Sequence, residues 1–417
     1  MMPSQRNFIS GLILVTLLSI PSCAGLGRTD SLPHSRSATD ESLSPESPYQ
    51  DIDQIEEGKI IHLPTGLEVS EARLVDLLAP ARVVYVGEVH DSLEDHRVQL
   101  TILKGIWERF PGKVVVGMEM FRRPDQPKIN QWVDGALPEK DFLKLWHESW
   151  SVDEGYYREI LNFIREKKVP VIALNASQEM EVKVRMKGIE GLSQNDRRGL
   201  PQVDREDPYH RQALQAVFKG HGSGAKGFDR FYDGMLLWDE TMAESIANYL
   251  SSPEGADKKM VVFAGGFHVG YGFGIPRRVF RRLPDPYQIV IPHAKDFPEE
   301  KRMMDVKVPD LPLTLSDFVW GVGYRELEDK KVRLGIFIEP LQTGIHVTDV
   351  FPDSTASLAG IQPGDIIASF DGQTLNEPFD LTYAVQQKAA GDRVKIKIIR
   401  DGKMIEAEAV MKSSNHP

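Results

Sequence analysis

Short apolar runs, each followed within four residues by a polar side chain, constrain the fold of this chain most strongly. The runs occupy residues 82–86, 113–118, 169–174, 260–264 and 287–291. Each is almost wholly hydrophobic, as is typical of strands buried on both faces, and helical patterns separate most of them. Ser92 and Asp95 can cap a helix between the first two runs, which predicts a βαβ unit with parallel strands. The sequence therefore predicts an α/β fold with a mostly parallel sheet.

The chain is too long for one typical domain, since it has 417 residues. Between Pro124 and Leu250 only one strand is expected, and the rest is helical, chiefly residues 156–168, 208–219 and 228–250. This is more helix than crossover connections need, so a helical lid subdomain over the sheet is expected. The predicted parts are a signal peptide (1–23), a disordered tether (24–54), an α/β domain (55–295), a charged connector (296–328) and a small β-rich domain (329–413).

The N-terminal segment is typical of an exported protein. Residues 8–20 are almost wholly apolar. This run has the length of the apolar core of a signal peptide and is too short to span a bilayer comfortably. The segment ends at Ser22 and Cys23, the only cysteine, and resembles a bacterial lipobox in which the cysteine is lipidated. A simple cleaved signal peptide is the alternative. Because Ala24 is not the aspartate that favours inner-membrane retention, we expect an outer-membrane lipoprotein facing the periplasm.

The charge of the chain argues against nucleic acid as a partner. Lys and Arg total 50 against 61 Asp and Glu, a net charge of -11. Such a protein gains little from counterion release on DNA or RNA.

Polar side chains follow nearly every predicted strand. Glu88 and His90 follow the first run, Glu119 the second, and His268 the fourth, while His96 lies near the start of the intervening helix. In an open parallel sheet these positions meet at one edge, where ligands bind. Singly, each residue has an ordinary structural explanation, such as a helix cap or a surface ion pair. Together they predict a site able to bind a transition metal or perform acid–base chemistry.

The motifs around these residues resemble a known superfamily. Gly87-Glu88-Val89-His90 and Gly265-Gly266-Phe267-His268 are similar to the paired G-x-x-H motifs of the Tiki/erythromycin-esterase-like superfamily. Residues 169–176, 231–242 and 265–276 resemble, more narrowly, the ChaN haem-binding uptake family. The resemblance covers about residues 65 to 295.

This resemblance implies two alternative functions. ChaN-like proteins are lipoproteins of haem or iron uptake that bind haem through a tyrosine with a histidine nearby. The tyrosine candidates here are Tyr156, Tyr157 and Tyr232, and apolar walls could come from Trp132, Trp146, Trp150 and Trp238. A basic cluster, Arg277, Arg278, Arg281 and Arg282, could meet haem propionates or lipid headgroups, or be a solvated face. Tiki-like relatives are instead metal-dependent hydrolases, so a divalent transition metal and enzymatic activity remain open.

The C-terminal unit resembles a PDZ domain of the HtrA-associated kind. The resemblance is carried by residues 332–338, 347–352, 354–359 and 360–367, and by two strands joined through Asp401-Gly402. It implies that the turn at Leu334, Gly335 and Ile336 binds a peptide carboxylate, while the peptide adds a strand to the sheet. Protein C-termini or partner segments are the expected ligands, with packing or assembly, including a homodimer, as the alternative.

Overall fold

The structure is a computed structural model that describes residues 49–219, 224–298, 301, 313–328, 331–341 and 344–413. The expected signal peptide, Cys23 and most of the tether lie outside these residues. The chain divides into two compact units, residues 1–326 and 327–417. Each unit is described separately below.

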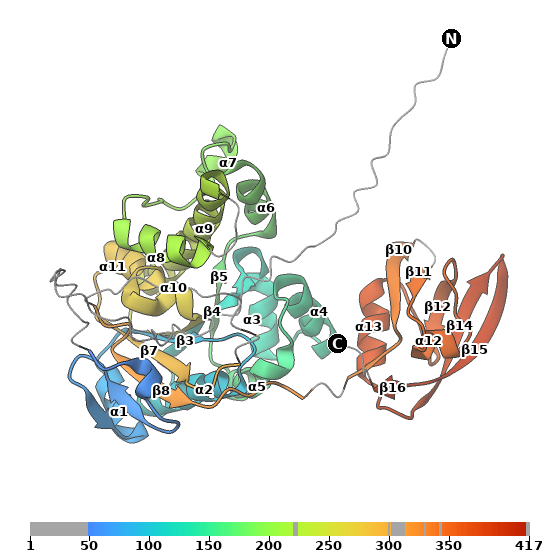
Figure 1. Cartoon of the computed structure of the whole chain (residues 1–417), viewed down its shortest axis with the longest axis horizontal. Helices are drawn as coiled ribbons and strands as arrows, with labels where there is room; N and C mark the ends of the chain where they lie inside the picture. The colour runs from blue at the N-terminus through green and yellow to red at the C-terminus, as the bar shows by residue number, and fades with distance from the viewer. Residues whose placement is uncertain are drawn as a thin grey trace, which may run out of the picture. The chain divides into compact units, whose positions relative to one another are not determined.

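The first unit is built on an eight-stranded sheet with the order β2-β1-β8-β7-β3-β6-β4-β5 (Figure 1). Its strands are β1 (Ile60–His62), β2 (Leu67–Val69), β3 (Val83–Glu88), β4 (Val114–Arg122), β5 (Val171–Asn175), β6 (Lys259–Gly265), β7 (Tyr287–Ala294) and β8 (Phe318–Val322). The six strands from β8 to β5 are parallel, and β1 and β2 add an antiparallel edge. The predicted mostly parallel α/β sheet is confirmed, and all five expected strands belong to it.

Helices cover both faces of this sheet. One face packs against α1 (Glu71–Leu78), α2 (Leu93–Arg109), α3 (Gln126–Asp134), α4 (Glu139–Ser149) and α5 (Arg158–Lys167). The other packs against α9 (Gly224–Ser251), α10 (Gly266–Val269) and α11 (Ile275–Arg282). The short 3-10 helices are η1 (Ile52–Gln54), η2 (Arg123–Asp125), η3 (Glu154–Tyr157) and η4 (Gly270–Gly272). Ser92 caps α2 by accepting a hydrogen bond from the backbone of Asp95, as the sequence predicts.

The expected lid corresponds to a helical group beside α9. It comprises α6 (Gln178–Lys187), α7 (Gln194–Arg198) and α8 (Pro208–Lys219), and Figure 1 shows α6, α7 and α8 standing away from the sheet with one end of α9. Two small apolar clusters hold this group together, one around Tyr232 and Leu236 and the other around Val184 and Leu237. The helix expected over residues 156–168 is not part of it, because η3 and α5 pack on the sheet.

Two details differ from the sequence-based expectations, and a third goes beyond them. Residues 318–322, expected in the connector, form β8, whose Phe318 and Val319 are buried in the sheet. Residues 52–54, expected in the tether, form η1, which is followed by the buried Ile55. The strands β3 and β4 are parallel, but β6 lies between them, because a strand distant in sequence is inserted there. This insertion decides which polar groups meet at the strand ends.

The second unit is a small β-rich domain. Its strands are β9 (Val332–Arg333), β10 (Ile336–Leu341), β11 (Gly344–Val350), β12 (Ile366–Phe370), β13 (Gln373–Thr374), β14 (Arg393–Arg400), β15 (Lys403–Val410) and β16 (Lys412–Ser413), with helices α12 (Thr355–Leu358) and α13 (Pro378–Gln386). The main sheet has the order β10-β11-β12-β14-β15, so β10 is an edge strand. Asp401 and Gly402 both have positive φ and join β14 to β15 as the expected tight hairpin.

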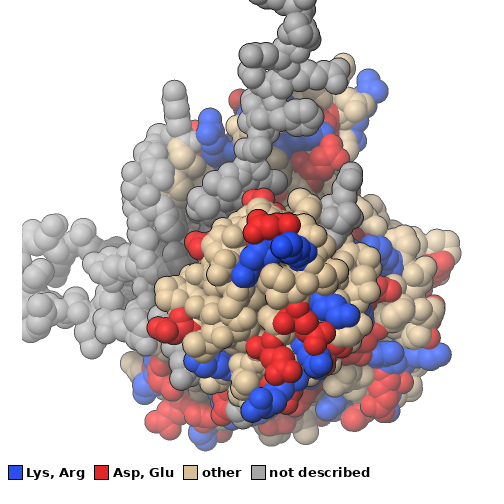
Figure 2. All heavy atoms as spheres, turned by 90° about the vertical axis from the view of Figure 1, so that its right-hand side faces the viewer, with Lys and Arg blue, Asp and Glu red and all other residues tan. Residues whose placement is uncertain are grey.

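The exposed surface is mixed in charge. On the face shown in Figure 2, basic and acidic side chains are interspersed. No helix in the described part of the chain is long and apolar enough to cross a membrane.

Candidate functional site

The polar residues predicted at the strand ends come together at the carboxyl edge of the first sheet. Glu88 is the last residue of β3, and its backbone is in register with Gly265 at the end of β6. His268 follows on α10, and Glu119 lies in β4 on the other side of β6. Gly265, which is in register with Glu88, donates its N–H to Glu119, so the two sides of the site lie close together. These residues form two hydrogen-bonded groups, the Glu88 group and the Asp239 group.

The Glu88 group gathers three hydrogen-bond partners and one further histidine around one buried carboxylate. Oε1 of Glu88 lies 2.7 Å from Nδ1 of His90 and accepts a hydrogen bond from the Tyr157 hydroxyl. Oε2 accepts a hydrogen bond of 2.6 Å from the Gln99 amide and lies 3.4 Å from Nε2 of His96. Burial alone would raise the pKa of Glu88, but His96 and His90 outweigh it and hold the pKa well below its ordinary value. Glu88 is therefore a carboxylate, although it is inaccessible to solvent.

His90 is the most accessible member of this group. Its side chain is 18% exposed, and its ring meets Trp150 edge-to-face with centroids 4.9 Å apart. Burial lowers the pKa of His90, but the hydrogen bond and charge of Glu88 outweigh it, so the pKa is raised. Since Nδ1 is bonded to Glu88, Nε2 is the nitrogen left to contact a ligand.

The Asp239 group is enclosed in the protein. Oδ1 of Asp239 lies 2.6 Å from Nδ1 of His268, and Nε2 of that histidine lies 3.4 Å from Oε1 of Glu119. The other oxygen of Glu119 accepts a hydrogen bond of 2.7 Å from the backbone N–H of Gly265. Burial lowers the pKa of His268, but Glu119 and Asp239 outweigh it and raise the pKa to about 9. His268 is therefore an imidazolium held between two carboxylates at neutral pH.

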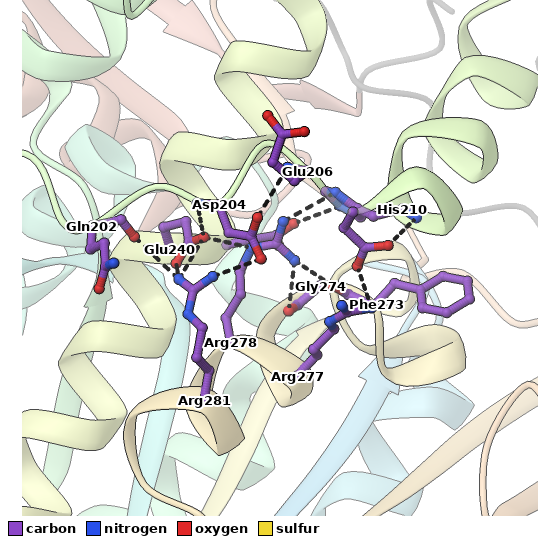
Figure 3. A network of polar contacts seen from close by, with 12 residues as sticks. Gln202, Asp204, Glu206, His210, Glu240, Phe273, Gly274, Arg277, Arg278 and Arg281 are labelled. Carbon is purple, nitrogen blue, oxygen red and sulfur yellow. Dashed lines mark hydrogen bonds and ion pairs between the residues drawn. The ribbon is translucent and has the colours of Figure 1, made fainter.

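A chain of contacts behind Asp239 fixes the direction of these hydrogen bonds. Nε2 of His210 lies 3.1 Å from Oδ2 of Asp239, and Nδ1 of His210 lies 3.2 Å from a guanidinium nitrogen of Arg278. Figure 3 shows His210 beside Arg278. Because a guanidinium can only donate, Nδ1 of His210 must accept and carries no proton. Nε2 of His210 therefore faces the second oxygen of Asp239 at ion-pair distance, although neither atom has a hydrogen-bond partner among the described residues.

The predicted basic cluster on α11 is neutralised inside the protein. Glu240 is fully buried and makes ion pairs with Arg278, Arg281 and Arg282. Arg277 pairs with Asp207 at 2.9 Å, and Arg281 also pairs with Asp204 at 2.9 Å (Figure 3). These contacts hold the segment before α8 against α11. In this arrangement each of the four arginines is paired with a carboxylate of the protein itself.

The three candidate tyrosines have different surroundings. The hydroxyl of Tyr157 donates to Glu88, and burial raises its pKa well above the ordinary value, which disfavours a phenolate. Tyr232 is fully buried, and burial raises its pKa to about 12. Tyr156 is half-buried, and its ring lies 6.1 Å from that of His96. Of the three, Tyr156 is therefore the residue best placed to meet a ligand at the surface of the site.

The sequence did not identify three residues that complete the site. Gln99 holds Glu88, and Asp239 with His210 holds His268. A signal for Asp239 did exist, because it lies next to Glu240 in the middle of an otherwise apolar helical stretch, where acids are rarely buried without partners. His210 carried no such signal. His293, another strand-end histidine, pairs with Asp53 of η1 at 2.9 Å.

The apolar walls expected from tryptophan are only partly at the site. Trp150 contacts His90, and the ring of Trp238 lies 6.1 Å from that of His268. Trp132 and Trp146 are buried in the apolar core beneath α3 and α4. Across the described residues, no group of three or more His, Cys, Asp or Glu side chains is arranged to hold a metal ion.

The carboxylate-binding turn expected in the second unit is formed at the start of β10. Gly335 has a φ of +72°, and a Cβ atom placed on it would lie 2.4 Å from Cβ of Ser354. Its carbonyl accepts a hydrogen bond of 2.9 Å from the N–H of Phe351. Leu334 is buried in the core of the domain, and Ile336 packs partly against it. This turn therefore requires glycine at position 335.

Comparison with known proteins gives two family matches. Residues 74–279 match the family described as haem-binding uptake, Tiki superfamily, ChaN, and residues 332–410 match the PDZ domain family. The solved structure of ChaN from Campylobacter jejuni, described as showing cofacial haem binding, aligns with 63% of this chain and 95% of its own, at 15% identity and a TM-score of 0.48.

Curated proteins resemble separate parts of the chain. The protein RETICULATA-RELATED 5, chloroplastic, of Arabidopsis thaliana is 24% identical over 289 residues, which is 64% of this chain and 37% of that protein. The periplasmic pH-dependent serine endoprotease DegQ of Escherichia coli is 29% identical over 155 residues, 37% of this chain and 29% of its own. The chain thus spans well under half the length of these two relatives.

Proposed function

Because residues 74–279 form a domain of the ChaN haem-binding uptake family and residues 332–410 form a PDZ domain, we propose that this protein binds haem and a partner's C-terminus. The haem would lie at the accessible side of the Glu88 group, and its role would be in haem or iron uptake. The observation that carries this proposal is the state of His90, which is partly exposed and held at Nδ1 by a buried carboxylate. A carboxylate in that position orients an imidazole and makes it more basic toward iron.

The residues at this side of the site fit haem better than a bare metal ion. Haem supplies ferric iron that needs only one or two protein ligands, and phenolate oxygen and imidazole nitrogen both serve. Tyr156, whose ring lies 6.1 Å from that of His96, would supply the phenolate, and Trp150, whose ring meets that of His90, would offer an apolar surface to the porphyrin. A hydrolytic metal centre usually needs three protein ligands. The described residues contain no such group, which favours haem over the metal-dependent hydrolase or peptidase.

Titration of the purified full-length protein with hemin, followed by absorption spectroscopy, tests the haem site. We expect saturable spectral changes and a phenolate-to-iron charge-transfer band that Tyr156→Phe removes. His90→Ala should weaken binding by about tenfold or more, which is the usual effect of losing a group beside a metal. Tyr232→Phe is the matched control and should leave the spectrum unchanged, because that tyrosine is buried in the cluster between α8 and α9.

A different result would favour the alternative function. If hemin gives no saturable change, and one equivalent of a divalent metal co-purifies and is lost in His268→Ala, the hydrolase is the better proposal. Elemental analysis of the same preparation supplies that measurement.

The proposed location is the periplasmic face of the outer membrane, with a lipid on Cys23. The support is the apolar segment of residues 8–20, followed by the only cysteine of the chain. Cys23→Ala should move the protein from the membrane fraction to the soluble fraction. A variant that still partitions with membranes would show that another feature anchors the protein.

The PDZ domain would bind a terminal carboxylate at the turn formed by Leu334, Gly335 and Ile336. Backbone N–H groups in such a turn bind carboxylate, and the edge strand β10 can accept an added strand. Gly335→Val should abolish peptide binding, since it combines a strained φ with a clash at Ser354. Gly402→Val is the control, because Gly402 has a similar φ of +73° with nothing within 4 Å. Equal losses in both variants would contradict the assignment of this turn.

A further inference from the structure

The open edge of β10 has a defined beginning and end. The Gly335 carbonyl accepts from Phe351 and so faces β11. The register between β10 and β11 shifts between Phe337 and Ile338, but the extra residue lies on β11, so backbone groups still alternate along β10. The polar groups of Phe337 and Glu339 therefore also face β11, and those of Ile336 and Ile338 face outward. The next outward position is Pro340, which has no N–H to donate. Only two residues of β10 can therefore bond a ligand strand through both backbone groups.

The two faces of β10 differ in chemistry. The side chains of Ile336 and Ile338 pack against the apolar core of the domain. On the opposite face, Phe337 is 55% exposed and Phe351 is 47% exposed, although their rings lie only 5.0 Å apart. Exposed aromatic pairs of this kind are costly to leave in water and are typical of contact surfaces. Glu339 is exposed on the same face as Phe337, one strand repeat further along.

The ends of this strand also differ in charge. Arg333, which is exposed, immediately precedes the glycine turn, whereas the exposed carboxylate of Glu339 lies toward the far end of β10. A ligand that runs antiparallel to β10 with its carboxylate at the turn brings its fourth residue from the end opposite the carboxylate of Glu339. The charge distribution therefore suits a peptide with a free C-terminus and a basic residue upstream.

Resting on the proposed peptide-binding function, we propose that this groove recognises only the last four residues of a partner protein. In cross-strand register, the last residue of the ligand lies opposite Ile336 and is apolar. The penultimate residue lies opposite Phe337 and is aromatic, stacking on Phe337 and Phe351. The third residue from the end bonds Ile338, and the fourth lies opposite Glu339 and is basic. Pairing stops at Pro340, so residues further upstream add no affinity.

Fluorescence anisotropy with the full-length protein tests this selectivity. The probe is a labelled peptide that ends in lysine, serine, phenylalanine and valine with a free carboxylate. Replacing the penultimate phenylalanine with alanine should weaken binding about three- to tenfold, the usual value of an aromatic pair. That difference should disappear in Phe337→Ala. The control Met404→Ala removes an equally exposed apolar side chain from β15, at the opposite edge of the sheet, and should preserve it.

Two further arms test the charge and the length of the ligand. A peptide with glutamate in place of the lysine should bind about two- to fivefold more weakly, and Glu339→Lys should reverse the preference. Lengthening the peptide from four to eight residues should change affinity less than about twofold in the natural protein. The same extension should strengthen binding to Pro340→Ala, because that variant restores a backbone N–H at the third outward position.

The outcomes separate this inference from the function on which it rests. Suppose that replacing the penultimate phenylalanine or the lysine of the peptide changes affinity by the same factor in Phe337→Ala and Glu339→Lys as in the natural protein. That result would overturn the inference and leave peptide binding intact. Steady gains in affinity beyond four residues in the natural protein would also overturn it. If no free-carboxylate peptide binds at all, the proposed function fails and the inference fails with it.

Discussion

The Glu88 group and the Asp239 group both place a histidine against a buried carboxylate, but they are assembled in different ways. Glu88, His90, His96 and Gln99 lie within twelve residues of each other, and only Tyr157 is distant in sequence. In the Asp239 group, the partners Glu119, His210, His268 and Arg278 come from four separate elements.

The two groups also differ in how they meet solvent. The His90 side chain is 18% exposed and keeps one nitrogen for a ligand, while every member of the Asp239 group is at least nine-tenths buried. A carboxylate with several local donors can hold a histidine at the surface. A carboxylate shared by two buried histidines instead ties the site to the rest of the fold. We therefore expect the Glu88 group to govern binding and the Asp239 group to govern stability.

Asp239→Asn should have the largest effect on the free energy of unfolding. Asp239 is fully buried and lies 2.6 Å from Nδ1 of His268 and 3.1 Å from Nε2 of His210. A neutral amide at this position would remove the negative charge that balances the buried imidazolium of His268. We expect a loss of about 3–5 kcal/mol, the range for breaking a buried ionic contact, measured by urea denaturation.

Asp229→Asn is the control for that measurement. Asp229 is 56% exposed in its pair with Arg211, so the change should cost less than about 1 kcal/mol. Equal and small losses in the two variants would show that the Asp239 group does not stabilise the fold.

The pH dependence of stability should come next in size. The pKa of His268 is raised in the folded state to about 9 from an ordinary value of 6.5, so folding favours its protonated form. This contribution is complete below about pH 6.5 and is lost as the pH rises through 9. The expected decrease is on the order of 3 kcal/mol, and the raised pKa of His90 acts in the same direction.

Urea denaturation at several pH values between 6 and 10 checks this decrease, with His268→Gln as the comparison. The variant should be less stable at pH 6 and should lose less stability than the natural protein as the pH rises. Parallel curves for the two proteins would contradict the assignment to His268.

The smallest effect should distinguish two buried tyrosines. Tyr157→Phe removes one of the donors to Glu88 and should cost about 1–3 kcal/mol. Tyr232→Phe removes a buried hydroxyl that has no hydrogen-bond partner among the described residues, so it should cost less than about 0.5 kcal/mol. Thermal denaturation of the two variants provides the measurement. A larger loss of stability for Tyr232→Phe than for Tyr157→Phe would contradict the assignment of the stabilising hydrogen bond to Tyr157.

By itself the sequence determined the architecture and most of the Glu88 group. Continuous apolar runs require strands buried on both faces, and parallel strands bring their carboxyl ends to one edge, so Glu88, Glu119 and His268 could be expected there. The PDZ unit was equally evident, because its glycine turn and its Asp401-Gly402 hairpin depend on local backbone geometry.

Only the tertiary structure decided which groups pair and which stay accessible. The insertion of β6 between β3 and β4, and of residues 318–322 into the sheet as β8, depends on pairing between distant strands that no local pattern specifies. The same holds for Asp239 between His210 and His268, and for the arginines gathered on Glu240. These contacts reflect the cost of burying charge, which can be met by any partner that the fold brings within reach.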